Sequence, residues 1–418
     1  MEFTTVPDVD SLRPSDLRMT FRRAPTTYFY EEVATDTTDA DGRANAHLRF
    51  GTLVGDARVI VRCPALGLSD TIHFNVRPGT AALVAMAVGD TIVSPGAGYS
   101  IGAYPTDRYR NRAAGTVTYM PAVNVASVDA AGLVTAGTAI GKGRVVVRLT
   151  AKAVDTARFT VLPRVHAAGF LWPWDQNGKI VSANLDGSGW KVLTGATGPA
   201  YPSASPTRSE VAYHQGEVSM YAIYIVDSTG ARRRLVDSNV VRDVVYPRFS
   251  ADGQRVYFAG RAPGAPTSAI WRINRDGTGL ERLVDVSKLN DGNDGAQVGV
   301  SPDERRIVFN DSLGVVVYTI STGTRTVIGS NGTQATFSPD GQRIAYTNAT
   351  ALVITNVDGT LLESIPFRGA GADGLAWLPD SRWLLLRTID GATLLDTATG
   401  EQVPIRQFAE LHQISIGD

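Results

Sequence analysis

Two kinds of turn recur between residues 165 and 418, and this repetition constrains the fold more than any other feature of the sequence. The first turn reads Ser-Pro-Asp-Gly or a variant, with clear copies at Ser250–Gly253 and Ser338–Gly341 and weaker ones at Ser205–Pro206, Ser301–Glu304 and Pro379–Asp380. The second turn ends at Gly187, Gly230, Gly277, Gly323, Gly359 and Gly400, at intervals of 36 to 47 residues. A period near 40–45 residues with four short strands per repeat is typical of a β-propeller.

The two kinds of turn differ in number, because six copies of the second accompany five of the first. The first repeat lacks its innermost strand, whereas a spare strand-like segment, Leu411–Ile416, remains at the C-terminal end. We therefore expect a six-bladed ring in which this last segment completes the first blade. Such closure removes the free sheet edges that an open array of blades would expose.

The chain as a whole has the pattern of an all-β protein. Short stretches rich in Val, Ile, Thr and aromatic residues alternate with turn residues, as in Ala57–Arg62, Arg144–Thr150 and Gly314–Ile320. Residues 1–163 differ from the repeats and form two blocks typical of β-sandwiches. The sequence therefore predicts an all-β fold, with two β-sandwich segments followed by a six-bladed β-propeller.

The repeats resemble those of the TolB-type propeller family. The units of that family carry a Ser-Pro-Asp-Gly turn and an Ile-Ala-Phe strand, and Ser338–Gly341 followed by Arg343–Tyr346 matches this pattern. The resemblance covers residues 165–418, roughly three fifths of the chain. It implies a propeller with protein partners in the cell envelope. The sandwich segments differ from the usual companion domain of TolB, which leaves the set of partners open.

The N-terminal blocks resemble two groups of bacterial immunoglobulin-like domains. Residues 36–77 are similar to the second half of the invasin type, through Asp39–Ala44, Leu48–Thr52 and Phe74–Val76. Residues 80–163 are similar to the other common group, through Val88–Asp90, Val125–Asp129, Gly132–Ala136 and Gly143–Val147. These resemblances imply spacer or adhesive modules on bacterial surfaces. The predicted domains are a partial immunoglobulin-like domain at 1–79, a second one at 80–163 and the propeller at 164–418.

Charge and composition exclude several classes of partner. Forty basic and 41 acidic side chains give a formal net charge of −1, whereas nucleic-acid or anionic-membrane surfaces need a basic excess. No apolar run reaches the roughly 18 residues that a membrane helix requires, so we expect no membrane insertion. As a separate expectation, the protein is a monomer. The single cysteine, Cys63, excludes an internal disulfide. Because Met1–Phe3 runs without a leader into half a domain, we expect a fragment of a secreted, periplasmic or cell-surface protein.

Two motifs that could carry chemistry are better explained as structure. Gly98–Gly102 has the form Gly-x-Ser-x-Gly, but Ser100 lies in an alternating stretch with no helix signal after it, so we predict a strand rather than a nucleophile elbow. The carboxylates of the recurring turns bond to backbone amides ahead of them, which is ordinary turn chemistry. These are Asp186, Asp252, Asp276, Asp303, Asp340, Asp358 and Asp380.

The segment Asn290–Gly295 is denser in oxygen ligands, since it holds Asp291, Asp294 and two amides in six residues. Calcium takes six to eight oxygens, and such a loop could supply several of them. The segment lacks the spacing and the closing bidentate glutamate of an EF-hand loop. We therefore predict no cofactor, with calcium at Asp291 and Asp294 as the alternative.

Propeller ligands bind in the funnel where loops enter the innermost strands. Seven residues before the serine of the first turn stand Asp243, Asp294 and Asn331, in three consecutive blades. Further candidates in neighbouring positions are Arg242, Asp373, Tyr201, Tyr246 and His214, the last at the point where we expect a strand to leave its sheet. These side chains could converge near the axis and bind a ligand, although chance polar loops would explain the same pattern.

The leading interpretation is a non-enzymatic exported binding protein, in which immunoglobulin-like spacers present a TolB-like propeller to a protein or carbohydrate partner. The alternative is a secreted hydrolase or lyase that acts on a carbohydrate or ester in the funnel, with Asp243 and Asp294 as acid and base. A third possibility is a purely structural surface protein.

Overall fold

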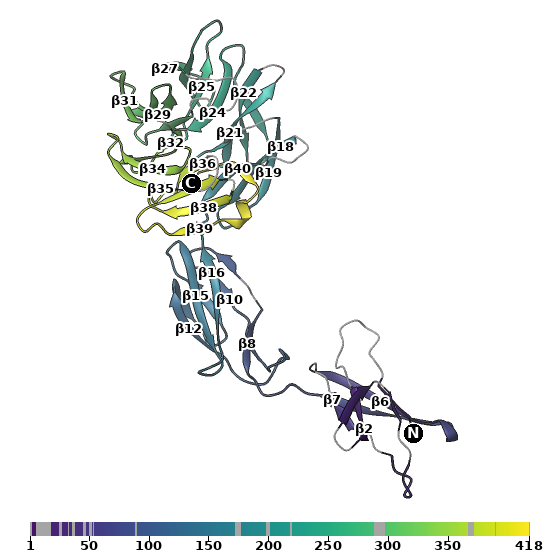
Figure 1. Cartoon of the computed structure of the whole chain (residues 1–418). Helices are drawn as coiled ribbons and strands as arrows, with labels where there is room; N and C mark the ends of the chain where they lie inside the picture. Colours follow the sequence, from purple (N-terminus) through teal and green to yellow (C-terminus); the bar gives the residue numbers. More distant parts are fainter. Residues whose placement is uncertain are drawn as a thin grey trace. The chain divides into compact units, whose positions relative to one another are not determined.

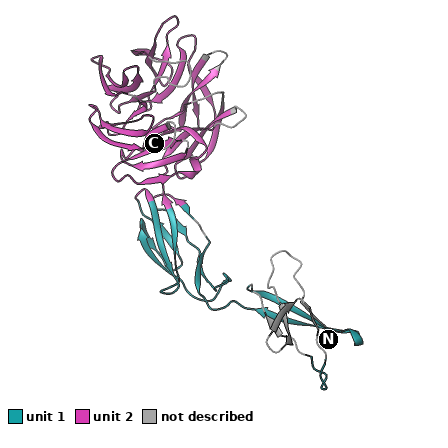
Figure 2. Ribbon diagram, viewed as in Figure 1, with its two compact units in different colours: residues 1–91, 96–138, 142–159 teal, residues 92–95, 139–141, 160–418 magenta. Residues whose placement is uncertain are grey.

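The computed structural model describes the chain apart from residues 1, 6–17, 25–26, 32, 36–37, 45–46, 50–51, 53, 88–89, 172–176, 198–200, 218–219, 288–296, 331, 367–371, 389 and 418. The chain divides into two compact units, residues 1–91, 96–138 and 142–159 and residues 92–95, 139–141 and 160–418 (Figure 2). Within the described residues only two single-turn 3₁₀ helices occur, η1 (Pro64–Leu66) and η2 (Arg406–Phe408), so the predicted all-β fold is confirmed. None of these described helices is of the length and apolarity that spanning a bilayer requires.

The N-terminal part of the first unit contains two antiparallel sheets, with orders β4-β1-β6-β7 and β3-β2-β5. The strands are β1 (Glu2–Thr5), β2 (Arg18–Ala24), β3 (Thr27–Glu31), β4 (Val33–Thr35), β5 (His47–Arg49), β6 (Gly55–Cys63) and β7 (Leu68–Val76). Along β6, the buried side chains of Ala57 and Val59 flank the exposed Arg58, which is the period-two alternation of a sheet with one covered face.

The strands that follow form a second group of antiparallel sheets, with orders β12-β15-β16-β9, β10-β14-β13 and β11-β8. They are β8 (Leu83–Met86), β9 (Thr91–Val93), β10 (Gly98–Ser100), β11 (Ala103–Thr106), β12 (Thr118–Val123), β13 (Val125–Val128), β14 (Leu133–Ala136), β15 (Gly141–Arg148) and β16 (Val154–Val161). Ser100 is exposed at the end of β10, which pairs with β14, so the prediction of a strand at this motif is confirmed.

Six four-stranded antiparallel sheets make up the described part of the chain from His166 to Ile416 (Figure 1). The first has the order β19-β18-β17-β40, and the others run β20 to β23, β24 to β27, β28 to β31, β32 to β35 and β36 to β39. The first two sheets and the closing strand are β17 (His166–Leu171), β18 (Asn177–Asn184), β19 (Lys191–Thr197), β20 (Ser203–Ala204), β21 (Glu210–Glu217), β22 (Met220–Asp227), β23 (Arg232–Val236) and β40 (Leu411–Ile416).

The remaining four sheets follow in chain order. Their strands are β24 (Arg242–Phe249), β25 (Arg255–Arg261), β26 (Ser268–Asn274), β27 (Glu281–Val286), β28 (Val298–Val300), β29 (Arg306–Asp311), β30 (Gly314–Thr319), β31 (Thr324–Gly329), β32 (Thr333–Phe337), β33 (Arg343–Thr347), β34 (Ala351–Asn356), β35 (Leu361–Pro366), β36 (Ala372–Trp377), β37 (Trp383–Thr388), β38 (Gly391–Asp396) and β39 (Gln402–Pro404). Apolar side chains such as Phe258 and Ile223 fill the space between neighbouring sheets, which buries both faces of the central strands.

The last strand supplies the inner strand of the first sheet. β40 pairs antiparallel with β17, from Leu411 opposite Leu171 to Ile416 opposite Ala167, as the unequal numbers of turns predict. We call β40, β20, β24, β28, β32 and β36 the inner strands. Each contacts the next, and β36 contacts β40 in turn, so the inner strands surround a common axis.

The recurring turns have the chemistry that their sequence predicts. In each of the seven turn aspartates, Oδ1 accepts a hydrogen bond from the backbone N–H two residues ahead, at 2.9 to 3.1 Å. Glu304 occupies the place that glycine takes in two other copies, with φ of 54°, and its carboxylate reaches the neighbouring sheet. The turn carboxylates are therefore structural.

Candidate functional site

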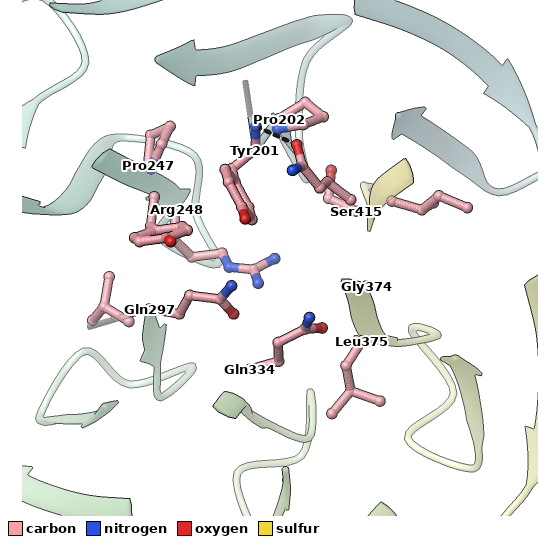
Figure 3. A pocket seen from close by; sticks show the side chains of 13 residues that line it. Tyr201, Pro202, Pro247, Arg248, Gln297, Gln334, Gly374, Leu375 and Ser415 are labelled. Atoms are coloured by element: carbon pink, nitrogen blue, oxygen red, sulfur yellow. Dashed lines mark hydrogen bonds between the residues drawn. The ribbon is translucent and has the colours of Figure 1, made fainter. Parts of the chain in front are cut away.

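A cavity of about 40 Å³ lies on the axis of the second unit, where the inner strands meet (Figure 3). Each of the six inner strands, or the residue just before it, contributes side chains to the wall. The residue four positions before the first residue of the turn (Ser205, Ser250, Ser301, Ser338, Leu378 or the equivalent Gly417) lines the cavity in every sheet, and we call this set the first ring. It consists of Tyr201, Tyr246, Gln297, Gln334, Gly374 and Gln413.

The sixth member of the first ring is placed by a shared hydrogen bond. In the sheet that begins with β24, the N–H of Ser250 donates to the carbonyl oxygen of Arg255, and the N–H of Gly417 donates in the same way to His166. Gly417 therefore stands where the other sheets have the first residue of the turn. Gln413, four residues earlier, occupies the corresponding place on β40.

Backbone irregularities turn the first-ring side chains toward the axis. Tyr201, Tyr246, Gln334 and Gln413 have positive φ angles, between 39° and 57°. The ladder between β24 and β25 shifts register on both sides of Val245, and the ladder between β32 and β33 shifts across Gln334. A bulge of this kind re-aims one side chain without ending the strand. Gly374 is the small member, and a Cβ there would lie 3.0 Å from the backbone nitrogen of Ile414.

A second ring lies two residues after the first ring along the chain. It consists of Ser203, Arg248, Gly299, Thr336, Ala376 and Ser415. Five of the six are small, whereas Arg248 is long and cationic. Arg248 lines the cavity, and burial lowers the pKa of its guanidinium. Ser415 accepts a hydrogen bond from the N–H of Ala204 at 2.8 Å, which joins β40 to the start of the second sheet.

An aromatic cluster covers one side of the cavity. The ring of Tyr201 stacks on His214 with centroids 5.5 Å apart, and it meets Tyr246 edge-on at 4.4 Å. His214 is also edge-on to Tyr221 at 5.2 Å. The backbone N–H of Tyr246 lies 3.4 Å from His214 Nδ1, which accepts its hydrogen bond. The cluster therefore fixes the two tyrosines that the sequence had singled out.

The expected position of His214 at the end of a strand is wrong. β21 continues to Glu217, and His214 lies inside it, opposite Ile223 of β22 and almost fully buried. Residues Gln215–Glu217 also pair with β22, so the strand continues beyond its apolar residues. His214 thus lies beneath the tyrosines and contributes to their positions.

Only part of the set of side chains predicted for the funnel lies among the described residues. Asp243 has a φ of 53° and forms an ion pair with Arg261. Arg261 is also the residue opposite the exposed Arg242 in the ladder between β24 and β25. Neither Asp243 nor Arg242 lines the cavity. Asp373 lies in β36, directly before Gly374. Asp291, Asp294 and Asn331 fall outside the described residues.

The sequence contained the signal for the first ring, at a different offset. Counting four residues back from the first residue of the turn gives the first-ring residues, whereas a count of seven gives Asp243 at the start of β24 and, in the other four copies of the first turn, positions outside the described residues. Gln297, Gln334 and Gln413 were missed for this reason, and Arg248, two residues before Ser250, lies at neither offset. Chemically, the described wall offers phenol, carboxamide and guanidinium groups, which hold a polar ligand by donating hydrogen bonds.

The comparisons with known proteins give evidence on the fold alone. No family model and no curated protein matches the chain. Among solved structures, TolB from Acinetobacter baumannii is similar at a TM-score of 0.50 and 15% identity, over 80% of this chain and 99% of that chain. A nidogen/laminin complex (TM-score 0.46, 13% identity, 60% of this chain and 98% of that chain) is too distant to carry an argument. The likeness to TolB concerns the fold alone, and it identifies the repeat region as a TolB-like β-propeller.

Proposed function

We propose that the repeat region is a six-bladed β-propeller closed by β40, preceded by two immunoglobulin-like spacers. The six four-stranded sheets, the contacts between successive inner strands and the pairing of β40 with β17 support the closed ring. The antiparallel sheets of β1 to β16, together with the sequence resemblances at 36–77 and 80–163, support the spacers.

The function that this geometry supports best is protein binding at the bacterial cell envelope, over the end of the ring that holds the aromatic cluster. The observation that carries it is the convergence of six inner strands on one cavity, with Tyr201, Tyr246 and Arg248 in its wall. Tyrosine and arginine at the concave centre of a surface are typical of the residues that dominate binding energy in protein interfaces. The resemblance of the repeats to the TolB type points to the same class of partner.

Site-specific crosslinking tests this proposal. Benzoylphenylalanine replaces Arg242, exposed at the start of β24, in one variant and Leu361, 60% exposed on the outer strand β35, in the control. Each full-length chain is produced in the periplasm of a bacterium and irradiated, and the crosslinked proteins are identified by mass spectrometry. We expect one defined adduct from position 242 and none from position 361.

The adduct must then form again from purified components and be suppressed by Tyr246→Ala. A chain that gives no adduct at position 242, or the same adducts at both positions, would contradict a protein-binding site at this end of the ring.

A further inference from the structure

Arg248 departs from the pattern of the second ring. The five equivalent positions hold serine, glycine, threonine, alanine and serine, which leave space around the axis. Into that space Arg248 extends its side chain, and Figure 3 shows its guanidinium near the middle of the cavity, with the amides of Gln297 and Gln334 on the same side. One long cation in a ring of small residues indicates a group placed for a ligand rather than for packing.

The guanidinium of Arg248 has no hydrogen-bond acceptor or carboxylate partner among the described residues. Arg248 is half-buried, whereas Arg387 near the axis is buried and shows what a desolvated guanidinium ordinarily needs. Its Nε donates to the carbonyl oxygen of Leu411 at 2.7 Å, and its Nη2 donates to that of Ala409 at 3.2 Å. A desolvated cation without a partner is unfavourable, and a bound anion would remove that penalty.

The size and the chemistry of the cavity restrict the anion. A single water needs roughly 10–15 Å³ of such space, so a cavity of about 40 Å³ holds a group of a few heavy atoms. The fork of a guanidinium matches the two oxygens of a carboxylate, and the carboxamides of Gln297 and Gln334 can donate to the same oxygens. A carboxylate on a short stem fits both restrictions.

We propose that the axial cavity is a carboxylate-binding site in which Arg248 holds both oxygens of the ligand. The carboxylate belongs either to a free organic acid or to an acidic side chain of a bound protein, and only the second source rests on the proposed function. In both cases Arg248 is the specificity-determining residue.

Titration of the full-length protein with sodium acetate, followed by NMR and calorimetry in low-salt buffer free of other carboxylates, tests the proposal. We expect saturable binding of acetate to the wild type and at least a tenfold weaker affinity in Arg248→Met. The matched control is Arg282→Met, since Arg282 is an exposed arginine of β27 paired with Asp285, and it should bind as the wild type does. Acetamide, which lacks the charge, should not bind.

Arg248→Lys keeps the charge but loses the fork, so it should bind more weakly than the wild type and more tightly than Arg248→Met. This variant also gives a readout should Arg248→Met not fold. Equal acetate affinity in wild type, Arg248→Lys and Arg248→Met would overturn the proposal. The proposal would also fail if acetate bound only to the double variant Asp291→Asn, Asp294→Asn and not to the wild type. A carboxylate of the protein itself would then already occupy the site.

A blocked tripeptide with a central glutamate separates the two sources. Tenfold tighter binding of the peptide than of acetate, lost in Arg248→Met, assigns the site to a protein ligand, whereas equal or weaker binding assigns it to a free acid. Binding of neither probe to the wild type would overturn the proposal. Failure of the crosslink at position 242 would leave the acetate result standing, so the two proposals fail independently.

Discussion

Arg387 binds Leu411 through a hydrogen bond of 2.7 Å from the guanidinium Nε to the backbone carbonyl oxygen, and so ties the sixth sheet to the strand that completes the first. Replacing Arg387 with methionine keeps the apolar stem but leaves the carbonyl oxygens of Leu411 and Ala409 without this donor. We expect a loss of about 3 kcal/mol in unfolding free energy, measured by urea denaturation. The exposed Arg406→Met should change it by less than about 0.5 kcal/mol.

Removal of residues 409–418 should have a larger effect. It takes away the buried side chains of Leu411 and Ile414 and exposes the inner edge of β17. We expect a loss of several kcal/mol and aggregation, seen as a lowered melting temperature and early elution in size-exclusion chromatography. A truncated chain that melts with the full-length protein would show that β40 does not close the ring.

The carboxylate of Asp396 gives the fold a defined response to acid. Two hydrogen bonds from Arg382, at 2.8 and 2.6 Å, lower the pKa of Asp396 to about 2, and its side chain is only 2% exposed. The folded pKa lies below the unfolded value, so the stabilisation is complete above about pH 4 and disappears as the pH falls toward 2. It amounts to about 2 kcal/mol. The stability gap between wild type and Asp396→Asn should close over this range, and a constant gap would disprove the assignment.

Glu304 joins two sheets at a turn. Its Oε2 accepts hydrogen bonds from Arg255 at 2.8 Å and from the fully buried Tyr257 at 2.6 Å. We expect Glu304→Ala to cost about 2 kcal/mol in thermal or urea unfolding, because the Tyr257 hydroxyl loses its acceptor. Glu281, whose pair with Arg272 is half exposed, is the matched control, and its alanine variant should lose less than about 1 kcal/mol. Equal losses in the two variants would argue against the link between sheets.

Ser100 should be inert toward serine-directed reagents. It is exposed on β10, whereas its neighbour Ile101 is buried, and the strand provides no strained turn. A fluorophosphonate probe should leave Ser100 unlabelled, and Ser100→Ala should keep the unfolding free energy within about 0.5 kcal/mol. Ile101→Ala should cost about 2–4 kcal/mol. Covalent labelling at Ser100 would reverse the assignment.

The repeating turns made much of the fold predictable. Each serine and aspartate of the first turn acts locally, through hydrogen bonds to residues up to five positions away, so the sequence contains the whole interaction. The pairing of Leu411–Ile416 was predictable by counting, because one sheet lacked a strand. The likeness to TolB in fold agrees with the resemblance of the repeats.

The orientation of the inner strands was not predictable in the same way. A strand without bulges turns alternate side chains to the axis, but β24 changes register on either side of Val245, and Tyr246 takes a positive φ. The alternation of apolar and polar residues within a repeat does not indicate where these register shifts fall. This is why the offset of seven selected Asp243, which binds Arg261 instead of lining the cavity.

The pairing of β17 with β40 also sets an order of events during biosynthesis. Ser415 pairs with Ala168, 247 residues earlier in the chain. At roughly 5–20 residues per second, a ribosome needs roughly 12 to 50 s to make the segment between them. Throughout that interval the inner edge of β17 lacks its partner, and the β40 of a second nascent chain would fit it equally well. Crowded synthesis should therefore raise the share of strand-swapped dimers formed beside the monomer.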